Sequence, residues 1–335
     1  MNRMLLQVRQ PNSKGKMFEL KTTIKYFTLL IVLFVTTCTF AQPYVDLINF
    51  NYQAVKTNYK DSFAGKSSID NFALNLMVPI KIDSQNTIIV RWFGERLNTS
   101  TVVNKNCTVP YNDIIANNDI NYSGQLYASF LPIGWQHQTK STSTGKNWKY
   151  LLLAMPKIAG TVGEKVTSDN FQLGVYAMAT RKLKDNLSIK GGLFYNKEFF
   201  GNFFVPILSV DWKVNSKFQM YGTFPTFYKF EYQLAKQKVY TGISYRSYTR
   251  SFLLSGSDKN YVRINDLSLK YFVDVYIKKK ILLFAEFGRM LNYSLLDFKH
   301  STKTEILTNP LYRKVNQPFF INCGVAYRIR FDFDK

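Results

Sequence analysis

The sequence has few of the residues on which most catalytic and metal sites depend. Its 335 residues include two histidines, His137 and His300, and three cysteines, Cys38, Cys107 and Cys323. Neither histidine stands in a nucleophile or metal motif, the cysteine spacing fits no zinc site, and no phosphate-binding glycine loop occurs. These absences argue against an enzyme, a metal and a cofactor. A hydrolase that uses His137 or His300 is the weakest functional hypothesis.

Long hydrophobic runs are also scarce. After residue 41 no stretch reaches the roughly 18 apolar residues of a transmembrane helix. The mean hydropathy of −0.16 is too low for a bundle of such helices, and the hydrophobic content of 46% is too high for a disordered chain. A membrane protein built from strands reconciles both values, because every second residue of such a strand can be polar without touching lipid.

Acidic residues are few beside the basic ones. The 22 Asp and Glu face 44 Lys and Arg, which gives a formal net charge of +22. In a soluble protein this excess would indicate nucleic-acid binding. Here the basic residues are scattered along strands and turns without a basic helix, which argues against a nucleic-acid partner. The expected partners are outer-membrane lipid and lipopolysaccharide, together with anionic small solutes.

One long uncharged run lies near the start of the chain, at residues 26–40. Two lysines precede it, and Thr39 and Ala41 supply the small residues of a cleavage site. The run is too short to span a bilayer, so it predicts a secretory signal peptide cleaved near Ala41. We therefore expect an upstream extension plus signal peptide over residues 1–41 and an exported domain over residues 42–335.

The cysteines leave two alternatives open. Cys38 lies in the targeting segment, where it can end a lipid-attachment box, although Thr37 is large for the position before it. Cys107 and Cys323 stay in the mature chain. Two unpaired or buried thiols are favoured over a disulfide, although an exported chain meets an oxidising compartment.

The mature region repeats a period of two. The clearest case is residues 72–81, where Phe72, Leu74, Leu76, Val78 and Ile80 alternate with mostly polar residues. Alternation predicts a strand with one apolar and one polar face. We count fourteen such segments, and merging of short strands would lower the number to twelve: 45–59, 72–82, 88–95, 122–137, 148–158, 171–179, 187–196, 204–213, 218–224, 228–234, 239–250, 269–277, 281–291 and 319–333.

Connection lengths alternate as well. Short turns at 83–86, 184–186, 214–217 and 278–280 interleave with longer segments at 96–120, 160–169, 251–261 and 299–316, while 139–147 is intermediate. Outer-membrane barrels show this asymmetry. In hydrocarbon an unpaired backbone group costs several kcal/mol, so a sheet must close on itself there. The predicted fold class is all-β, a closed antiparallel transmembrane β-barrel of about 12–14 strands preceded by the cleaved signal peptide.

Charged residues on the less apolar strand faces are predicted to face the lumen. On the lipid face, an arginine near the midplane would cost roughly 2–4 kcal/mol. Arg289 falls among outward residues, and we place it near the rim. The lumen-facing candidates are Arg91, Glu95, Lys190, Arg246, Lys270, Asp274, Glu286, Arg328 and Arg330.

Several soft motifs resemble one uncharacterised family of outer-membrane β-barrels, the domain of unknown function 6268. They are the signal ending at residues 39–41, the alternating strands, the segments 223–225 and 230–232, and the aromatic last strand. The resemblance covers nearly all of residues 43–333. It implies a barrel in the outer membrane of a Gram-negative bacterium and no known activity.

The last strand also resembles the assembly signal of outer-membrane proteins. Tyr327, Phe331 and Phe333 supply its alternating aromatics, although Asp334 and Lys335 follow where such a signal ends in Phe. This resemblance implies the barrel-assembly machinery as a partner.

Two functions remain open for such a barrel. One is a passive pore whose basic lumen favours anionic solutes, with Arg246, Arg250, Lys270, Arg328 and Arg330 projecting inward. The other is a non-conducting structural or binding barrel whose lumen is filled by ion pairs such as Lys270 with Asp274 or Glu286. The sequence does not decide between them, because lumen filling depends on shear and side-chain packing.

Overall fold

A computed structural model describes residues 43–58, 66–102, 122–140, 147–254, 259–298 and 317–331. The chain divides into two compact units, residues 1–38 and 39–335, and every described residue belongs to the second. The predicted signal peptide with its cleavage site, Cys107, His300 and Phe333 lie outside the described residues. No helix in the described ranges is long and apolar enough to cross a membrane.

The described residues form fifteen strand segments and one short 3-10 helix. The first eight segments are β1 (Tyr44–Asn58), β2 (Lys66–Lys81), β3 (Asn86–Val102), β4 (Tyr122–Phe130), β5 (Ile133–Gln138), β6 (Trp148–Thr161), β7 (Phe171–Lys184) and β8 (Leu187–Glu198), with the helix η1 (Ser168–Asn170) before β7. The others are β9 (Gly201–Lys213), β10 (Phe218–Thr223), β11 (Phe227–Ala235), β12 (Val239–Leu253), β13 (Tyr261–Lys278), β14 (Ile281–Phe298) and β15 (Phe319–Arg330).

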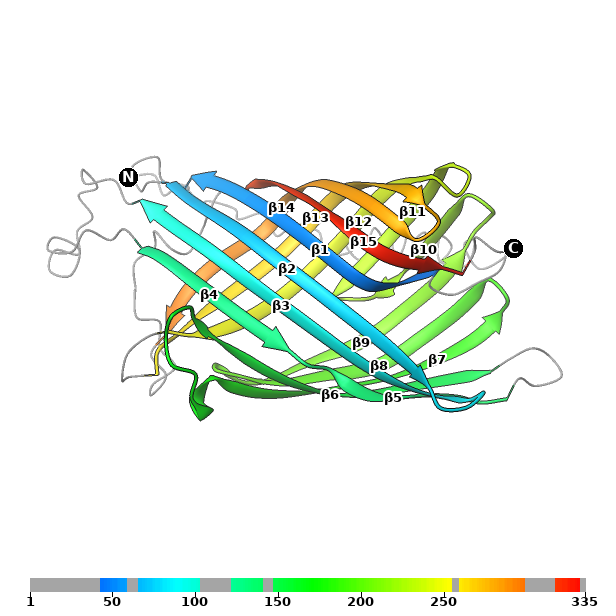
Figure 1. Ribbon diagram of the computed structural model, residues 1–335, viewed down its shortest axis with the longest axis horizontal. Helices are drawn as coiled ribbons and strands as arrows, with labels where there is room; N and C mark the ends of the chain where they lie inside the picture. The colour runs from blue at the N-terminus through cyan, green and yellow to red at the C-terminus, as the bar shows by residue number, and fades with distance from the viewer. Residues whose placement is uncertain are drawn as a thin grey trace, which may run out of the picture. The chain divides into compact units, whose positions relative to one another are not determined.

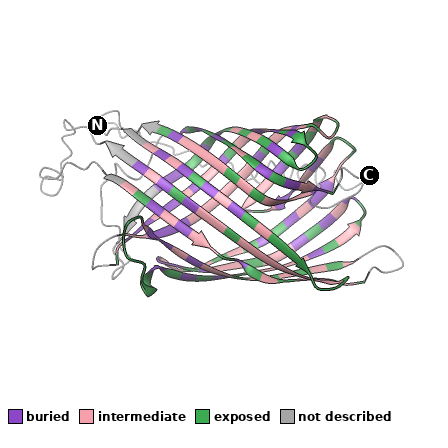
Figure 2. Cartoon of the chain, viewed as in Figure 1, coloured by how far each residue is buried: buried purple, intermediate pink, exposed green. Residues whose placement is uncertain are grey.

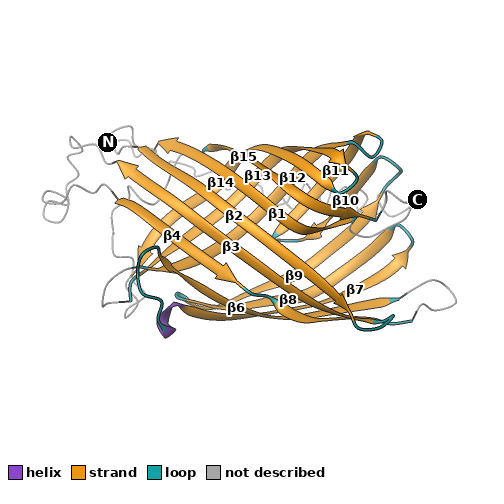
Figure 3. Cartoon of the chain, viewed as in Figure 1, coloured by secondary structure: helices purple, strands orange, loops and turns teal. Residues whose placement is uncertain are grey.

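All the segments join one antiparallel sheet that closes into a ring (Figure 1). Figure 3 shows the wall as strands crossing obliquely, with η1 as its small helix. The seam lies between the first and last strands, where eleven residue pairs run from Tyr44 opposite Arg330 to Val55 opposite Phe320. The prediction of a closed antiparallel barrel is confirmed.

Two of the fifteen segments share one place in the ring. β4 and β5 both pair with β3 and with β6, and only Leu131 and Pro132 separate them. Proline cannot donate to a strand ladder. The ladder nevertheless continues through the break, because Arg91 N–H donates to Pro132 O at 2.8 Å and Leu131 N–H donates to Pro156 O at 2.9 Å. The segments thus occupy fourteen places, the upper end of the predicted range.

The two ends of the barrel differ in their connections. We call one end the turn end, because five connections of two to four residues meet there: 82–85, 185–186, 214–217, 236–238 and 279–280. The opposite end, the loop end, has the connections 103–121, 162–170, 254–260 and 299–318. The predicted alternation therefore holds with three exceptions: the short connections 199–200 and 224–226 lie at the loop end, and the nine-residue connection 139–147 lies at the turn end.

The turn before β3 illustrates why these tight connections form. Asp83 Oδ1 accepts the backbone N–H groups of Gln85 at 2.6 Å and Asn86 at 2.8 Å, and Asp83 Oδ2 accepts the Asn86 side-chain amide at 2.7 Å. An aspartate that bonds backbone two and three residues onward stabilises a turn. Led by the Asn86 side chain, these donors lower the pKa of Asp83.

Burial alternates along the strands, as Figure 2 shows. In β2 the side chains of Phe72, Leu76 and Val78 are exposed, while those of Asn71 and Asn75 are buried. A closed sheet with apolar residues outside and polar residues inside has the inverse pattern of a soluble protein. The exposed apolar side chains form a belt around the barrel, and such a belt suits a hydrocarbon environment. The outward Arg289 lies beside the first residue of β15, with its guanidinium 5.5 Å from the Phe319 ring.

Candidate functional site

A neutral ion network crosses the interior near the turn end. We call it the turn-end cluster; it comprises Asp46, Lys229, Glu231, Asp274, Arg328 and Arg330, which come from β1, β11, β13 and β15. Arg328 binds Asp46 at 2.5 Å and Asp274 at 2.8 Å, and Asp274 also binds Lys229 at 3.0 Å. Arg330 binds Glu231 at 2.6 Å. Since β15 and β11 are not neighbours in the ring, this last contact can form only through the lumen.

Aromatic and polar side chains complete this layer. The Tyr44 ring lies 3.6 Å from the Arg328 guanidinium, and the Tyr240 ring lies 3.7 Å from that of Arg330. Glu231 accepts hydrogen bonds from Gln219 Nε2 at 2.6 Å and from the Tyr221 hydroxyl at 2.9 Å, and it is 0% exposed. Three cations face three carboxylates, so the layer carries no net charge.

A second layer lies toward the loop end. Arg250 of β12 binds Glu95 of β3 at 2.8 Å and Asp266 of β13 at 3.6 Å, and Arg246 binds Asp266 at 3.2 Å. Because β3 and β12 are far apart in the ring, the Arg250–Glu95 contact also spans the interior.

Apolar side chains fill the lumen around this second layer. Val55, Leu97, Leu126, Phe252 and Ile264 are buried together in one cluster contributed by β1, β3, β4, β12 and β13. Lys157 is buried beside them, and its Nζ lies 3.2 Å from Glu198. The loop-end part of the lumen is therefore packed like a protein interior.

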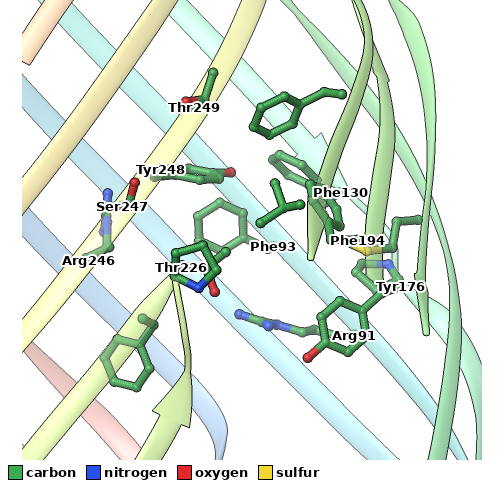
Figure 4. A pocket seen from close by; sticks show the side chains of 16 residues that line it. Arg91, Phe93, Phe130, Tyr176, Phe194, Thr226, Arg246, Ser247, Tyr248 and Thr249 are labelled. Atoms are coloured by element: carbon green, nitrogen blue, oxygen red, sulfur yellow. The ribbon is translucent and has the colours of Figure 1, made fainter. Parts of the chain in front are cut away.

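A cavity of about 480 Å³ lies between the two layers (Figure 4). Position along β12 shows the order: Tyr240 touches the turn-end cluster, Arg246 and Tyr248 line the cavity, and Arg250 binds Glu95. The lining residues are Arg91, Phe93, Phe130, Pro132, Met155, Tyr176, Phe194, Phe203, Val205, Pro225, Thr226, Phe227, Arg246, Ser247, Tyr248 and Thr249. Seven of these sixteen residues are aromatic, and Figure 4 shows Arg91 and Tyr248 reaching into the space.

The structure places the nine lumen candidates on the inner face. Glu95, Arg246, Asp274, Arg328 and Arg330 belong to the two ionic layers. The other four are distributed between these layers: Lys190 binds Asp211 at 2.6 Å, Lys270 binds Glu286 at 2.5 Å, and Arg91 lines the cavity.

Two of the three assembly-signal aromatics lie within or directly after β15. Tyr327 and Phe331 are exposed. Cys323, a free thiol on the same strand, is also exposed.

Sequence reasoning missed several inner residues. Asp46 and Tyr44 stand at the start of a loosely patterned strand, and Lys157 and Glu198 stand at strand ends. Alternate residues of a strand face the same side, so counting along the strand could have placed Lys157 on the inner face. The cavity had a weaker signal, since Phe93 and Phe203 each follow or precede another aromatic residue, so that both faces of the strand are apolar.

The family follows from a comparison with family models. Residues 37–328 match the model described as Domain of unknown function (DUF6268). The chain belongs to the DUF6268 family. Since the match spans nearly all of the barrel, the predicted resemblance is confirmed.

The DUF6268 barrel is also similar to several solved structures. The COG4313 outer membrane channel from Pseudomonas putida F1 is 11% identical, with 86% of this chain and 97% of that chain covered and a TM-score of 0.41. The P. putida toluene transporter TodX is 9% identical, with 86% and 91% covered and a TM-score of 0.39. The translocator domain of autotransporter NalP from Neisseria meningitidis is 8% identical, with 94% and 97% covered and a TM-score of 0.35. No curated protein matches the sequence.

Proposed function

We propose that this DUF6268 protein is a non-conducting outer-membrane barrel whose functional feature is the cavity in its lumen. One observation supports this choice over a passive pore. Buried ionic and apolar side chains occupy the lumen on both sides of the cavity. An ion crossing the barrel would have to displace contacts such as Arg330–Glu231 and Arg250–Glu95, whose members are all nearly inaccessible to solvent.

Five of the inner cations also lack the unpaired positive charge that a pore for anions needs. Arg246, Arg250, Lys270, Arg328 and Arg330 each have a carboxylate within 4.0 Å. A paired cation contributes little field to the lumen, because the carboxylate cancels it at close range. The basic excess of the composition therefore does not become a basic pathway through the described barrel.

Conductance of the purified protein in planar bilayers tests this proposal. We expect no unitary current steps at high protein loading, while a heat-modifiable gel shift shows that the same sample is folded. The variant Asp274→Asn should remain silent although it is less stable, because the layers at the loop end stay in place. Anion-selective steps from the folded wild-type protein would instead establish the passive pore.

The proposal includes export and assembly. We infer that the chain leaves the cytoplasm of a Gram-negative bacterium with a signal peptide cleaved near Ala41, and that Tyr327, Phe331 and Phe333 address it to the barrel-assembly machinery. The exposed apolar belt supports residence in a membrane. Mass spectrometry of protein from outer-membrane fractions should find an N-terminus at Gln42, and protein that retains the residues before Ala41 would contradict the cleavage.

A further inference from the structure

The wall of the barrel has an interruption on the side of the cavity. β10 and β11 have six and nine residues, whereas the flanking β9 and β12 have 13 and 15. The connection 224–226 ends the β10–β11 hairpin partway up the wall, where Leu208 N–H donates to Phe224 O at 3.2 Å and Ser247 N–H donates to Thr226 O at 2.8 Å. Beyond these bonds, no strand of the described ranges lies between β9 and β12.

The edges beside this interruption are suited to the absence of a partner strand. The N–H of Leu208 points toward β10, so the nitrogen two residues earlier points the same way, and that residue is Pro206, which has no N–H to leave unpaired. On β12, Ser251 N–H donates to Glu198 Oε2 at 3.1 Å, and Leu253 O accepts the Thr161 hydroxyl at 3.2 Å. Side chains thus replace a neighbouring strand.

The interruption is bounded on all sides, which makes it a window. On its loop-end side, Phe199 N–H donates to Ser251 Oγ at 3.2 Å, and the Phe199 ring lies 6.2 Å from that of Tyr261. The β8–β9 turn therefore meets β12 and β13 directly. On its turn-end side, the window ends at Thr226. Phe203 and Thr226 also line the cavity, so the cavity reaches the window.

On its β12 side the window lies at one margin of the apolar belt, whereas on the β9 side Phe204 and Leu208 are apolar and exposed. Outward residues of β12 change there from Ile243 and Tyr245 to Ser247 and Thr249, and the Thr249 hydroxyl bonds Asn265 at 3.1 Å. Phe224, just below the opening, stacks on Tyr245 with ring centroids 6.1 Å apart. Aromatic residues mark the level at which lipid head groups meet acyl chains. The window therefore opens where a membrane amphiphile has its head group.

One cation of the cavity lacks a carboxylate. Arg91 Nε bonds Asn75 Oδ1, and no carboxylate among the described residues lies within 4.0 Å of its guanidinium, in contrast to Arg246 beside Asp266. A guanidinium among aromatic walls favours an anionic partner, and it binds carboxylates with two parallel hydrogen bonds. The cavity volume of about 480 Å³ falls in the range of small-ligand sites.

We propose that the cavity binds an apolar chain carrying one anionic group, taken from the membrane through the window between β9 and β12, with the anion on Arg91. This inference rests on the proposed binding function and names its ligand class. The occupant is a membrane amphiphile such as a long-chain carboxylate. Its chain lies against Phe93, Phe130 and Phe203, and its head group replaces the missing counter-ion.

Fluorescence titration of the full-length mature barrel in lipid nanodiscs tests the head group. The probes are dansyl-undecanoate and the uncharged dansyl-undecanol of the same chain length. Arg91→Gln should weaken binding of the carboxylate by about tenfold or more, as expected for loss of a charged hydrogen bond, and should leave the alcohol unchanged. The control is Arg96→Gln, because Arg96 is on the same strand but exposed. Equal carboxylate affinity in Arg91→Gln and wild type would overturn the assignment.

A second pair of variants tests the route. Val205→Trp puts an indole into the cavity beside the window, and it should reduce binding of both probes by about tenfold or more, since it fills ligand volume. Leu208→Trp adds the same group to the outer face of β9 and should bind like wild type. A gel shift confirms folding of each variant.

The outcomes separate this inference from the proposed function. Undiminished binding by Val205→Trp, or no saturable binding by the folded wild type, overturns the ligand and its route while a silent bilayer still supports a closed barrel. Current steps in the bilayer overturn the closed barrel itself.

Discussion

Asp274 is the residue whose replacement tests the filled lumen most directly. Its Oδ2 atom lies 3.0 Å from Lys229 Nζ and 2.8 Å from Arg328 Nη1, and it is buried. Asp274→Asn keeps the shape and removes one of three carboxylates, so the turn-end cluster changes from neutral to a net charge of +1. Removing one partner of a buried ion pair costs about 3–5 kcal/mol, because the remaining charge stays desolvated without compensation. We expect the free energy of unfolding to fall by about that amount.

Urea unfolding of the barrel in lipid vesicles measures this change. The matched control is Asp169→Asn, since Asp169 pairs with Lys259 at 2.8 Å but both side chains are more than two-fifths exposed. Exposed pairs contribute about 0–1 kcal/mol, so the control should barely change stability. The double variant Lys229→Met with Asp274→Asn restores neutrality and should be more stable than Asp274→Asn alone. Equal small losses in Asp274→Asn and Asp169→Asn would refute the filled, low-dielectric lumen.

Three further outcomes follow from other parts of the barrel. Gly242→Ala should destabilise by about 1–3 kcal/mol in the same urea assay, because Gly242 has φ +151° and an added Cβ would lie 1.9 Å from Phe230 O, whereas Gly191→Ala meets no atom within 4 Å and should be tolerated. Lys157→Met, which strands the buried Glu198 carboxylate, should lower the thermal midpoint measured by the gel shift. NMR titration of Asp83 should give a pKa below that of an unfolded peptide. The stability it contributes is then present above the unfolded pKa and lost as pH falls through the folded value, and an unshifted pKa would contradict the turn geometry.

The outward face of each strand could be predicted from the sequence, because side chains in contact with lipid must be apolar. Lipid accepts only apolar side chains, so Phe72, Leu76 and Val78 reveal the outward parity of β2, and the parity of the charged residues follows. Strand number and hairpin positions then follow from turns such as 214–217. The same reasoning cannot give pairings inside the barrel.

Lys270 shows why the interior partners escape sequence analysis. Asp274, four residues along the same strand, shares its face but lies roughly 13 Å away by strand rise. Glu286 on the neighbouring strand is the actual partner at 2.5 Å, since the register of β13 and β14 puts it diagonally opposite. That register depends on a bulge between Tyr276 and Lys278, beside the hairpin turn, which no residue pattern predicts.

The cavity and window escaped prediction for a related reason. Where two consecutive residues are aromatic, as at Phe203 and Phe204, alternation no longer distinguishes lumen from lipid, and only the structure shows that Phe203 lines the cavity. In the sequence alone, β10 and β11 have the pattern of ordinary strands. Their shortness matters only relative to β9 and β12, and that comparison requires the shear of the barrel.

At the seam between β1 and β15, the first and last described residues of the barrel lie close enough to be joined by a linker. Phe331 N–H donates to Pro43 O at 2.8 Å, so these residues are already adjacent. A short linker between them, with new termini between Lys279 and Lys280, would preserve every strand pairing of the barrel. The seam would then lie between β13 and β14. Such a circular permutant would separate the proposed aromatic insertion signal from the last strand of the chain, because β15 would no longer be that strand.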